Sequence, residues 1–175
     1  MEKRFKKKNH AQLELSFSMI FSIILIIVFL VFAFWAIKKF LVFGDLTEIT
    51  KFKDSIQGDV DNIWRGQQGS WTPAEGYLLP KKIQYVCFVD FFSGAKGFNK
   101  EFYTNLNQAN SGGDENMAFY PVGSAQGLDS TKINHLNIAN ITENDNPYCI
   151  KNNGRVKLTI SKNYGENLVT ITRNG

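Results

Sequence analysis

At 175 residues the chain has room for an anchor and one ordinary domain, since domains most often hold about 100 to 150 residues. The first ten residues hold five basic side chains against Glu2 and account for the whole formal charge of +4, which leaves 15 basic and 15 acidic residues beyond them. A neutral body lacks the basic surface that binding to a phosphate backbone needs, so no nucleic-acid partner is expected.

Residues 15–37 carry no charge, and their only polar side chains are three serines near the start. A helix of this length measures about 34 Å, enough for a hydrocarbon core of about 30 Å. A secretory signal would have a shorter apolar core and a small-residue cleavage site, whereas Trp35 and Lys38-Lys39 stand here. We therefore predict a basic tail over 1–14 and a retained transmembrane helix over 15–40, with the lipid bilayer as its partner.

The distribution of basic residues favours one orientation of this helix. Five basic residues precede the span, and four follow it closely, at Lys38, Lys39, Lys51 and Lys53. Because the more basic flank tends to stay in the cytoplasm, we expect a single-pass protein of the cell membrane with a cytoplasmic N-terminus and its C-terminal domain outside.

Two further features of the C-terminal part agree with an outside location. Cys87 and Cys149 are the only cysteines, which predicts a disulfide between them, and Asn140 opens an Asn-Ile-Thr glycosylation sequon. The alternatives are that the cysteines are small buried apolar residues and that the sequon arises by chance in an asparagine-rich chain.

Gly44 and Asp45 are expected to separate the apolar run from a second helix over 45–65. Asp45 has the character of an N-cap, with Glu48 able to reach back from the third helical position. Apolar residues recur there at steps of three and four, which predicts one stripe that packs in a core or against a partner helix, at Leu46, Ile49, Phe52, Ile56, Val60 and Ile63. Glycines and prolines punctuate 66–80, which we interpret as a surface linker.

Residues 81–175 have the patterns of a β-rich domain. The nearly continuous apolar run 83–89 predicts a central strand covered on both faces, and 117–122 a second strand. Phe98, Phe102, Tyr103 and Leu106 predict a short helix, before an exposed loop at 110–114. Alternation in 156–160 and 169–172 across Asn163-Tyr164-Gly165 predicts a hairpin. The fold class is therefore α+β, with a mainly antiparallel sheet after the helices.

Residues 6–40 combine a lysine run, Ala11-Gln12-Leu13-Glu14 and an unbroken apolar segment. This region resembles the class III signal of archaeal type IV pilins and pilin-like proteins. The resemblance implies a leader over 1–11, cleavage between Ala11 and Gln12, and a long N-terminal helix followed by a β-rich head. Pilins of this kind usually carry glutamate at the fifth mature position, whereas Glu14 would be third and Ser16 fifth, and their helix more often continues past the point where Gly44 and Asp45 stand.

Glu14 lies at the edge of the apolar segment, where a carboxylate costs desolvation free energy unless it finds an amine or stays at the interface. In a pilus it could pair with the α-amine that cleavage creates on a neighbouring subunit. Alternatively, it contacts headgroups and water at the membrane surface.

No pattern in the sequence indicates a catalytic site, a cofactor or a metal site. There are only two histidines, and the cysteines have no close-spaced partner ligands, so zinc is not expected. Gly123-Ser124-Ala125-Gln126-Gly127 places its serine one position too early for a nucleophile elbow. The loop acids Asp90, Asp114, Glu115 and Asp129 match no calcium-loop spacing.

The preferred hypothesis is a non-enzymatic, membrane-anchored surface protein, a pilin-like subunit with a role in assembly, adhesion or binding. Its partners would be copies of itself or other membrane proteins, reached through the transmembrane helix. The first alternative is an uncleaved bitopic component of a membrane complex. The second is a membrane-anchored enzyme with its active site in the loops around 110–130.

Overall fold

The computed structural model describes residues 17–110 and 113–174. It divides into two compact units, residues 1–42 and residues 43–175. We call Phe17–Val42 the apolar segment, Phe43–Arg65 the core segment, and the unit over 43–175 the β-domain. The expected cleavage and assembly residues, Ala11, Gln12 and Glu14, lie outside the described residues.

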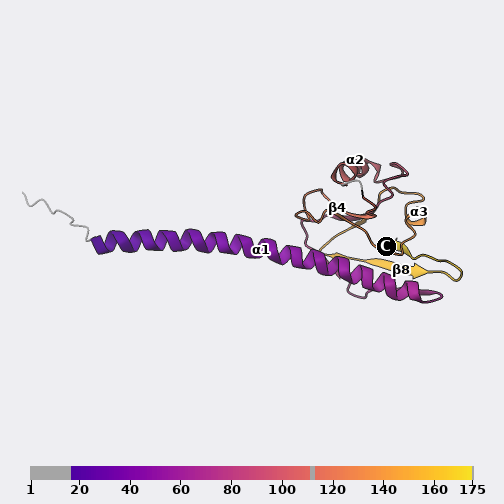
Figure 1. Cartoon of the computed structure of the whole chain (residues 1–175), viewed down its shortest axis with the longest axis horizontal. Helices are drawn as coiled ribbons and strands as arrows, with labels where there is room; N and C mark the ends of the chain where they lie inside the picture. Colours follow the sequence, from indigo (N-terminus) through magenta and orange to yellow (C-terminus); the bar gives the residue numbers. More distant parts are fainter. Residues whose placement is uncertain (1–16, 111–112, 175) are drawn as a thin grey trace, which may run out of the picture. The chain divides into compact units, whose positions relative to one another are not determined.

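The described elements confirm the α+β class (Figure 1). In chain order they are α1 Phe17–Arg65, β1 Gly69–Trp71, β2 Tyr77–Leu78, β3 Tyr85–Phe88, α2 Lys100–Ala109, β4 Met117–Tyr120, β5 Ser130–Thr131, α3 Ile138–Ile141, β6 Tyr148–Lys151, β7 Arg155–Val156, β8 Leu158–Lys162 and β9 Thr170–Arg173.

The prediction of a separate helix from residue 45 is wrong, because α1 runs without interruption from Phe17 to Arg65. The Thr47 hydroxyl donates to the Phe43 carbonyl oxygen at 3.0 Å, so the helical spacing passes across Gly44 and Asp45. The Asp45 carboxylate does not cap a helix but pairs with the Lys82 ammonium at 2.7 Å. A glycine inside a helix costs only about 1 kcal/mol of stability relative to alanine. The burial of several large side chains in the core segment stabilises the helix by more than this cost.

The predicted apolar stripe of the core segment is confirmed except at Leu46, which is only half-buried. Ile49, Phe52, Ile56 and Val60 are buried, and Ile63 packs against them. The Phe52 ring makes edge contacts with Tyr77 and Phe119, each at 5.9 Å between centroids. The core segment is therefore the central helix of the β-domain core.

Three antiparallel sheets pair within the described residues, in the orders β1-β8-β9, β2-β7 and β5-β4-β3-β6. The predicted hairpin is confirmed as β8 and β9, with Ile160 opposite Ile171, and β8 lies beside the core segment in Figure 1. The predicted central strand is confirmed as β3, which has β4 on one side and β6 on the other.

The expected linker over 66–80 is instead part of the fold. β1 pairs with β8, β2 pairs with β7, and Tyr77 and Leu79 are buried in the core. Glycine and proline mark the turns between these very short strands. Because these residues are frequent in 66–80, the sequence indicated a linker and did not predict the strand pairing. Gly76, for example, has φ +69° and lies so close to Val156 that a Cβ would collide with the backbone there.

The four-stranded sheet is covered on both faces. Val86, Phe88, Met117, Phe119 and Ile150 belong to the main core with the core segment. On the opposite face, Cys87, Val89, Ala118 and Cys149 form a second cluster with Leu106 of α2. The Phe102 ring of α2 stacks on Tyr120 at 4.1 Å between centroids, which fixes the predicted short helix on this face.

Candidate functional site

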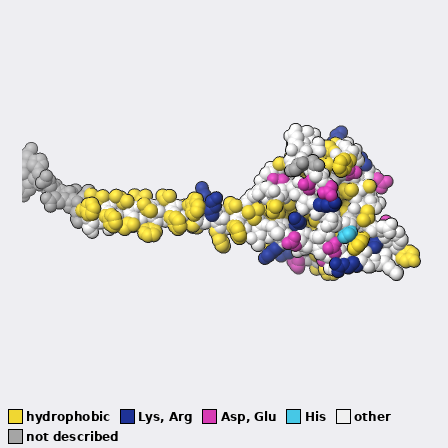
Figure 2. Space-filling model, in the orientation of Figure 1, with side chains coloured by type: hydrophobic (Ala, Val, Ile, Leu, Met, Phe, Trp, Pro, Cys, Tyr) yellow, Lys and Arg dark blue, Asp and Glu magenta, His cyan; other side chains and the backbone are white. Residues whose placement is uncertain are grey.

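The apolar segment is the clearest functional feature of the first unit. Its large apolar side chains are all exposed, from 40% for Leu25 to 84% for Phe17. Figure 2 shows hydrophobic side chains covering the visible side of this part of α1. A helix that is apolar on every side is typical of a membrane span, and α1 has the length and composition to cross a bilayer.

Polar groups within the apolar segment lie where such a span tolerates them. The Ser22 hydroxyl donates to the Ser18 carbonyl oxygen at 2.8 Å, so it needs no partner outside the helix. Trp35 lies beside Phe32, with 6.0 Å between ring centroids, and Lys38 and Lys39 follow it. An aromatic ring followed by long cationic side chains matches the boundary between hydrocarbon and headgroups.

The β-domain contains the predicted disulfide between Cys87 and Cys149. The two cysteines lie directly opposite each other on β3 and β6, and their Cα atoms are 4.0 Å apart. The Asn152 amide donates to the Gln84 carbonyl oxygen, which places Cys87 and Cys149 in a non-hydrogen-bonded pair of the ladder, where side chains approach most closely. The bond therefore ties an inner strand to an edge strand.

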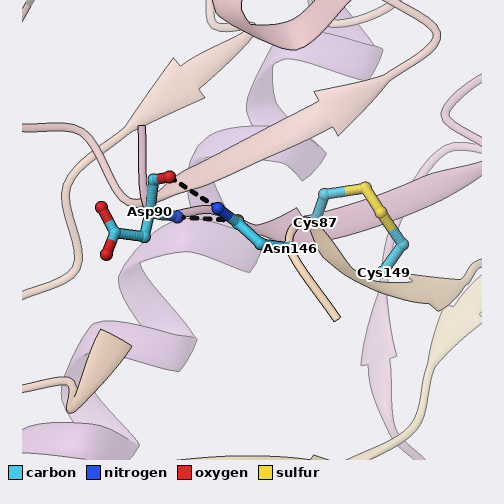
Figure 3. Close-up of a disulfide and its surroundings, with 4 residues drawn as sticks. All are labelled: Cys87, Asp90, Asn146 and Cys149. Carbon is cyan, nitrogen blue, oxygen red and sulfur yellow. Dashed lines mark hydrogen bonds between the residues drawn. A yellow bond between two sulfur atoms is a disulfide. The ribbon is translucent and has the colours of Figure 1, made fainter. Parts of the chain in front are cut away.

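The segment that leads into β6 is fixed by Asn146, which is fully buried. Its side-chain amide donates to the Asp90 carbonyl oxygen at 2.7 Å and accepts from the Asp90 amide at 3.0 Å, as Figure 3 shows beside the disulfide. It also donates to the Gly94 carbonyl oxygen at 2.6 Å. One side chain and one disulfide thus hold the ends of β3 and β6 together.

The sequon residue Asn140 lies on α3 and is exposed. The Thr142 side chain is buried, and its hydroxyl donates to the Ile138 carbonyl oxygen at 2.7 Å. The structure therefore places the asparagine of the sequon at the surface of the β-domain.

Three of the four loop acids, Asp90, Asp114 and Asp129, serve as local caps or ion pairs. Asp90 accepts from the amides of Phe92 and Ser93, and Asp129 accepts from those of Gly123 and Ala125. Asp114 pairs with Lys132, and this ammonium lowers the pKa of the carboxyl group. In the described part of the chain, no three metal-ligating side chains come together.

Ser124 lies in the turns between β4 and β5, and its amide donates to the Pro121 carbonyl oxygen. Its hydroxyl is buried and has no hydrogen-bond partner among residues 17–110 and 113–174. A nucleophilic serine needs a base within hydrogen-bond reach, so this geometry gives no support to a serine nucleophile.

A partly buried polar cluster joins the core segment to the first two strands. The Asp59 carboxylate accepts from the Tyr77 hydroxyl at 2.6 Å and from the Trp71 indole nitrogen at 3.1 Å. Burial raises the pKa of the Tyr77 hydroxyl far above its usual range, and the hydrogen bond to Asp59 raises it further. The neutral phenol therefore acts as a structural donor.

Sequence reasoning missed a basic groove of about 630 Å³ in the β-domain. Four cations line it, at Lys151, Arg155, Lys157 and Arg173. Three of them lie within seven residues of one another in the sequence, a local signal that the neutral overall charge concealed.

The described architecture is a long N-terminal apolar helix followed by antiparallel sheets, which is pilin-like in outline. The sequence matches no protein-family model and no curated protein, and no solved structure matches the chain.

Proposed function

We propose that this protein is a membrane-anchored, non-enzymatic surface subunit of the pilin-like kind, with the apolar segment in the bilayer and the β-domain outside. Its role would be assembly, adhesion or binding. Residues 1–11 would be a leader, removed by a membrane peptidase before Gln12.

One observation carries the proposal. The helix α1 provides both an apolar segment without a buried large side chain and a core segment with four side chains buried in the β-domain. The apolar segment has no place in the described core, so its surface is available to lipid or to the same segment of other subunits. The unbroken course of α1 past Gly44 also removes one of the two differences from pilins that the sequence had indicated.

The disulfide supports the proposed orientation. Disulfides persist in oxidising compartments and are rare in the cytoplasm of most cells, so a bonded Cys87–Cys149 pair favours a β-domain on the outer side. The basic residues before the apolar segment favour the same orientation.

Mass spectrometry of protein purified from native membranes tests the processing step. We expect a mass that corresponds to residues 12–175, with Gln12 at the N-terminus. A population that retains residues 1–11 throughout would contradict the pilin-like processing and favour the uncleaved bitopic protein.

Substitutions near the expected cleavage position sharpen this experiment. Ala11→Leu should prevent the mass loss, because a bulky residue before the scissile bond obstructs a peptidase that accepts alanine. Ser18→Ala is the matched control, since it changes a small residue in the apolar segment and should be processed as the unmodified chain is. Loss of processing in both variants, or in neither, would count against a cut before Gln12.

A further inference from the structure

The basic groove lies along β6 in the β-domain. Three consecutive residues of β6 line it, Cys149, Ile150 and Lys151, together with Arg173 at the end of β9 and Asn174 after it. Its volume of about 630 Å³ lies within the range of about 300 to 1,000 Å³ that is typical of ligand sites.

The charge of the groove has one sign. Its lining contains four cationic side chains and no carboxylate, although the β-domain as a whole has 13 basic and 14 acidic residues. Positive charge is therefore concentrated in the groove, although the β-domain as a whole is nearly neutral. Such a patch attracts anionic partners and selects against cationic ones.

Much of this positive charge is not neutralised within the described chain. Arg173 has one acidic neighbour, Asp145, at 3.4 Å, and Arg155 reaches only the carbonyl oxygens of Glu75 and Gly76, each at 3.4 Å. Lys151 and Lys157 are exposed and have no carboxylate within 4 Å among the described residues.

The groove also contains an open strand edge. β6 is the outermost strand of the order β5-β4-β3-β6, and none of the described strands pairs with its other side. Because the Asn152 amide bonds to Gln84, the ladder alternation directs the main-chain groups of Cys149 and Lys151 away from β3 and toward this open edge. An open edge is a template for another extended chain.

We propose that the groove binds an extended acidic peptide segment of a partner protein, which adds as a strand to β6 and places its carboxylates against Lys151, Arg155, Lys157 and Arg173. The main-chain groups of Cys149 and Lys151 supply the pairing, and the cations supply the selection for acid. The exposed ring of Phe98, which also lines the groove, offers an apolar contact to the same segment. This inference concerns the β-domain and is independent of N-terminal processing.

A peptide is favoured over an anionic glycan because of the strand edge. Cations alone attract any polyanion, but the outward main-chain donor and acceptor groups of β6 match the spacing of another strand. A glycan would pair with the cations, and the main-chain groups of β6 would remain hydrogen-bonded to water.

Fluorescence anisotropy on the full chain in nanodiscs tests the proposal with defined peptides. The probe is a labelled eight-residue peptide of alternating glutamate and threonine. It should bind with an affinity that falls as salt is added, whereas the glutamine–threonine peptide should not bind. A fully N-methylated form keeps the carboxylates but loses the main-chain donors, and it should bind at least about tenfold more weakly.

Charge variants locate the binding. The double substitution K151Q and K157Q should weaken binding about tenfold. The matched control K51Q and K53Q removes the same charge from the core segment, outside the groove, and should leave the affinity unchanged.

Three results would overturn the proposal. Equal weakening by both double variants would show general charge attraction instead of a site. Equal binding of the N-methylated peptide would rule out strand addition. Binding of an oligogalacturonate of equal charge, together with no binding of the glutamate peptide, would assign the groove to a glycan.

Discussion

The two parts of α1 form one helix but bury their apolar side chains very differently. In the apolar segment no large side chain is buried, whereas Ile49, Phe52, Ile56 and Val60 of the core segment are at most 2% exposed. The core segment restricts its apolar residues to one stripe, and the β-domain covers that stripe. Helix formation therefore does not determine burial. The arrangement of apolar residues around the helix determines whether each part suits a protein core or a lipid environment.

The largest expected difference between the two parts concerns the stability of the β-domain. Phe52→Ala would leave a cavity between Tyr77 and Phe119 and should lower the free energy of unfolding by about 3 to 5 kcal/mol. Phe34→Ala in the apolar segment is the matched control and should change it by less than about 0.5 kcal/mol. Denaturant unfolding in detergent measures both, and similar losses would contradict the separation of the two parts.

Removal of the disulfide should act on the β-domain alone. Replacing Cys87 and Cys149 together by alanine releases a constraint over a sequence separation of 62 residues, which is worth up to about 4 kcal/mol on chain-entropy grounds. The same variant should remain in the membrane fraction. Thermal unfolding and alkaline extraction of membranes measure the two properties, and release from the membrane would show that they are coupled.

A charge in the apolar segment should impair membrane insertion and leave the stability of the β-domain unchanged, the reverse of the effect of removing the disulfide. Leu30→Arg places a guanidinium within the proposed span, at a cost of about 3 kcal/mol for insertion, and should reduce the fraction that resists alkaline extraction. Unfolding of the β-domain should not change. Leu30→Phe is the control, and it should insert normally. Full membrane retention of the arginine variant would argue against a span centred here.

The buried phenol of Tyr77 predicts a dependence on alkaline pH that only the β-domain shows. Its pKa is raised in the folded chain, so this contribution to stability is complete below the unfolded pKa of about 10 and declines as the pH rises above it. Tyr77→Phe should lower stability by about 1.5 kcal/mol at neutral pH and make the alkaline decline shallower. Unfolding measured at several pH values tests this, and an equally steep decline would contradict it.

The smallest expected effect lies where the apolar and core segments meet. Gly44→Ala should stabilise the helix by about 0.5 to 1 kcal/mol, because a Cβ there meets no atom within 4 Å. Gly58→Ala has the same open surroundings inside the core segment and serves as the control. A loss of helix content by circular dichroism in the Gly44 variant alone would indicate that α1 needs a break at this position.

The sequence was most informative where a periodic pattern was long or where few pairings were possible. Spacing of three and four located the buried stripe of the core segment, and two cysteines permitted one intramolecular bond. It was least informative for short strands, because β2 and β7 have two residues each, too few to show a period. Their pairing depends on partners far along the chain.

The sequence mispredicted the helix boundary at residue 45 and did not reveal the basic groove, for related reasons. Asp45 and Glu48 have the local chemistry of a helix start, but packing of the residues after them made continuation of the helix more stable. The groove cations come from β6, β7, β9 and the residue between β7 and β8, and only the fold brings Arg173 to the other three.

The most direct test of the account is protease treatment of sealed native cells, followed by detection of the β-domain. We predict that the β-domain is digested without lysis, because the apolar segment spans the membrane and residues 43–175 lie outside. Survival of the β-domain in sealed cells, with digestion only after lysis, would contradict this orientation and the surface role that depends on it.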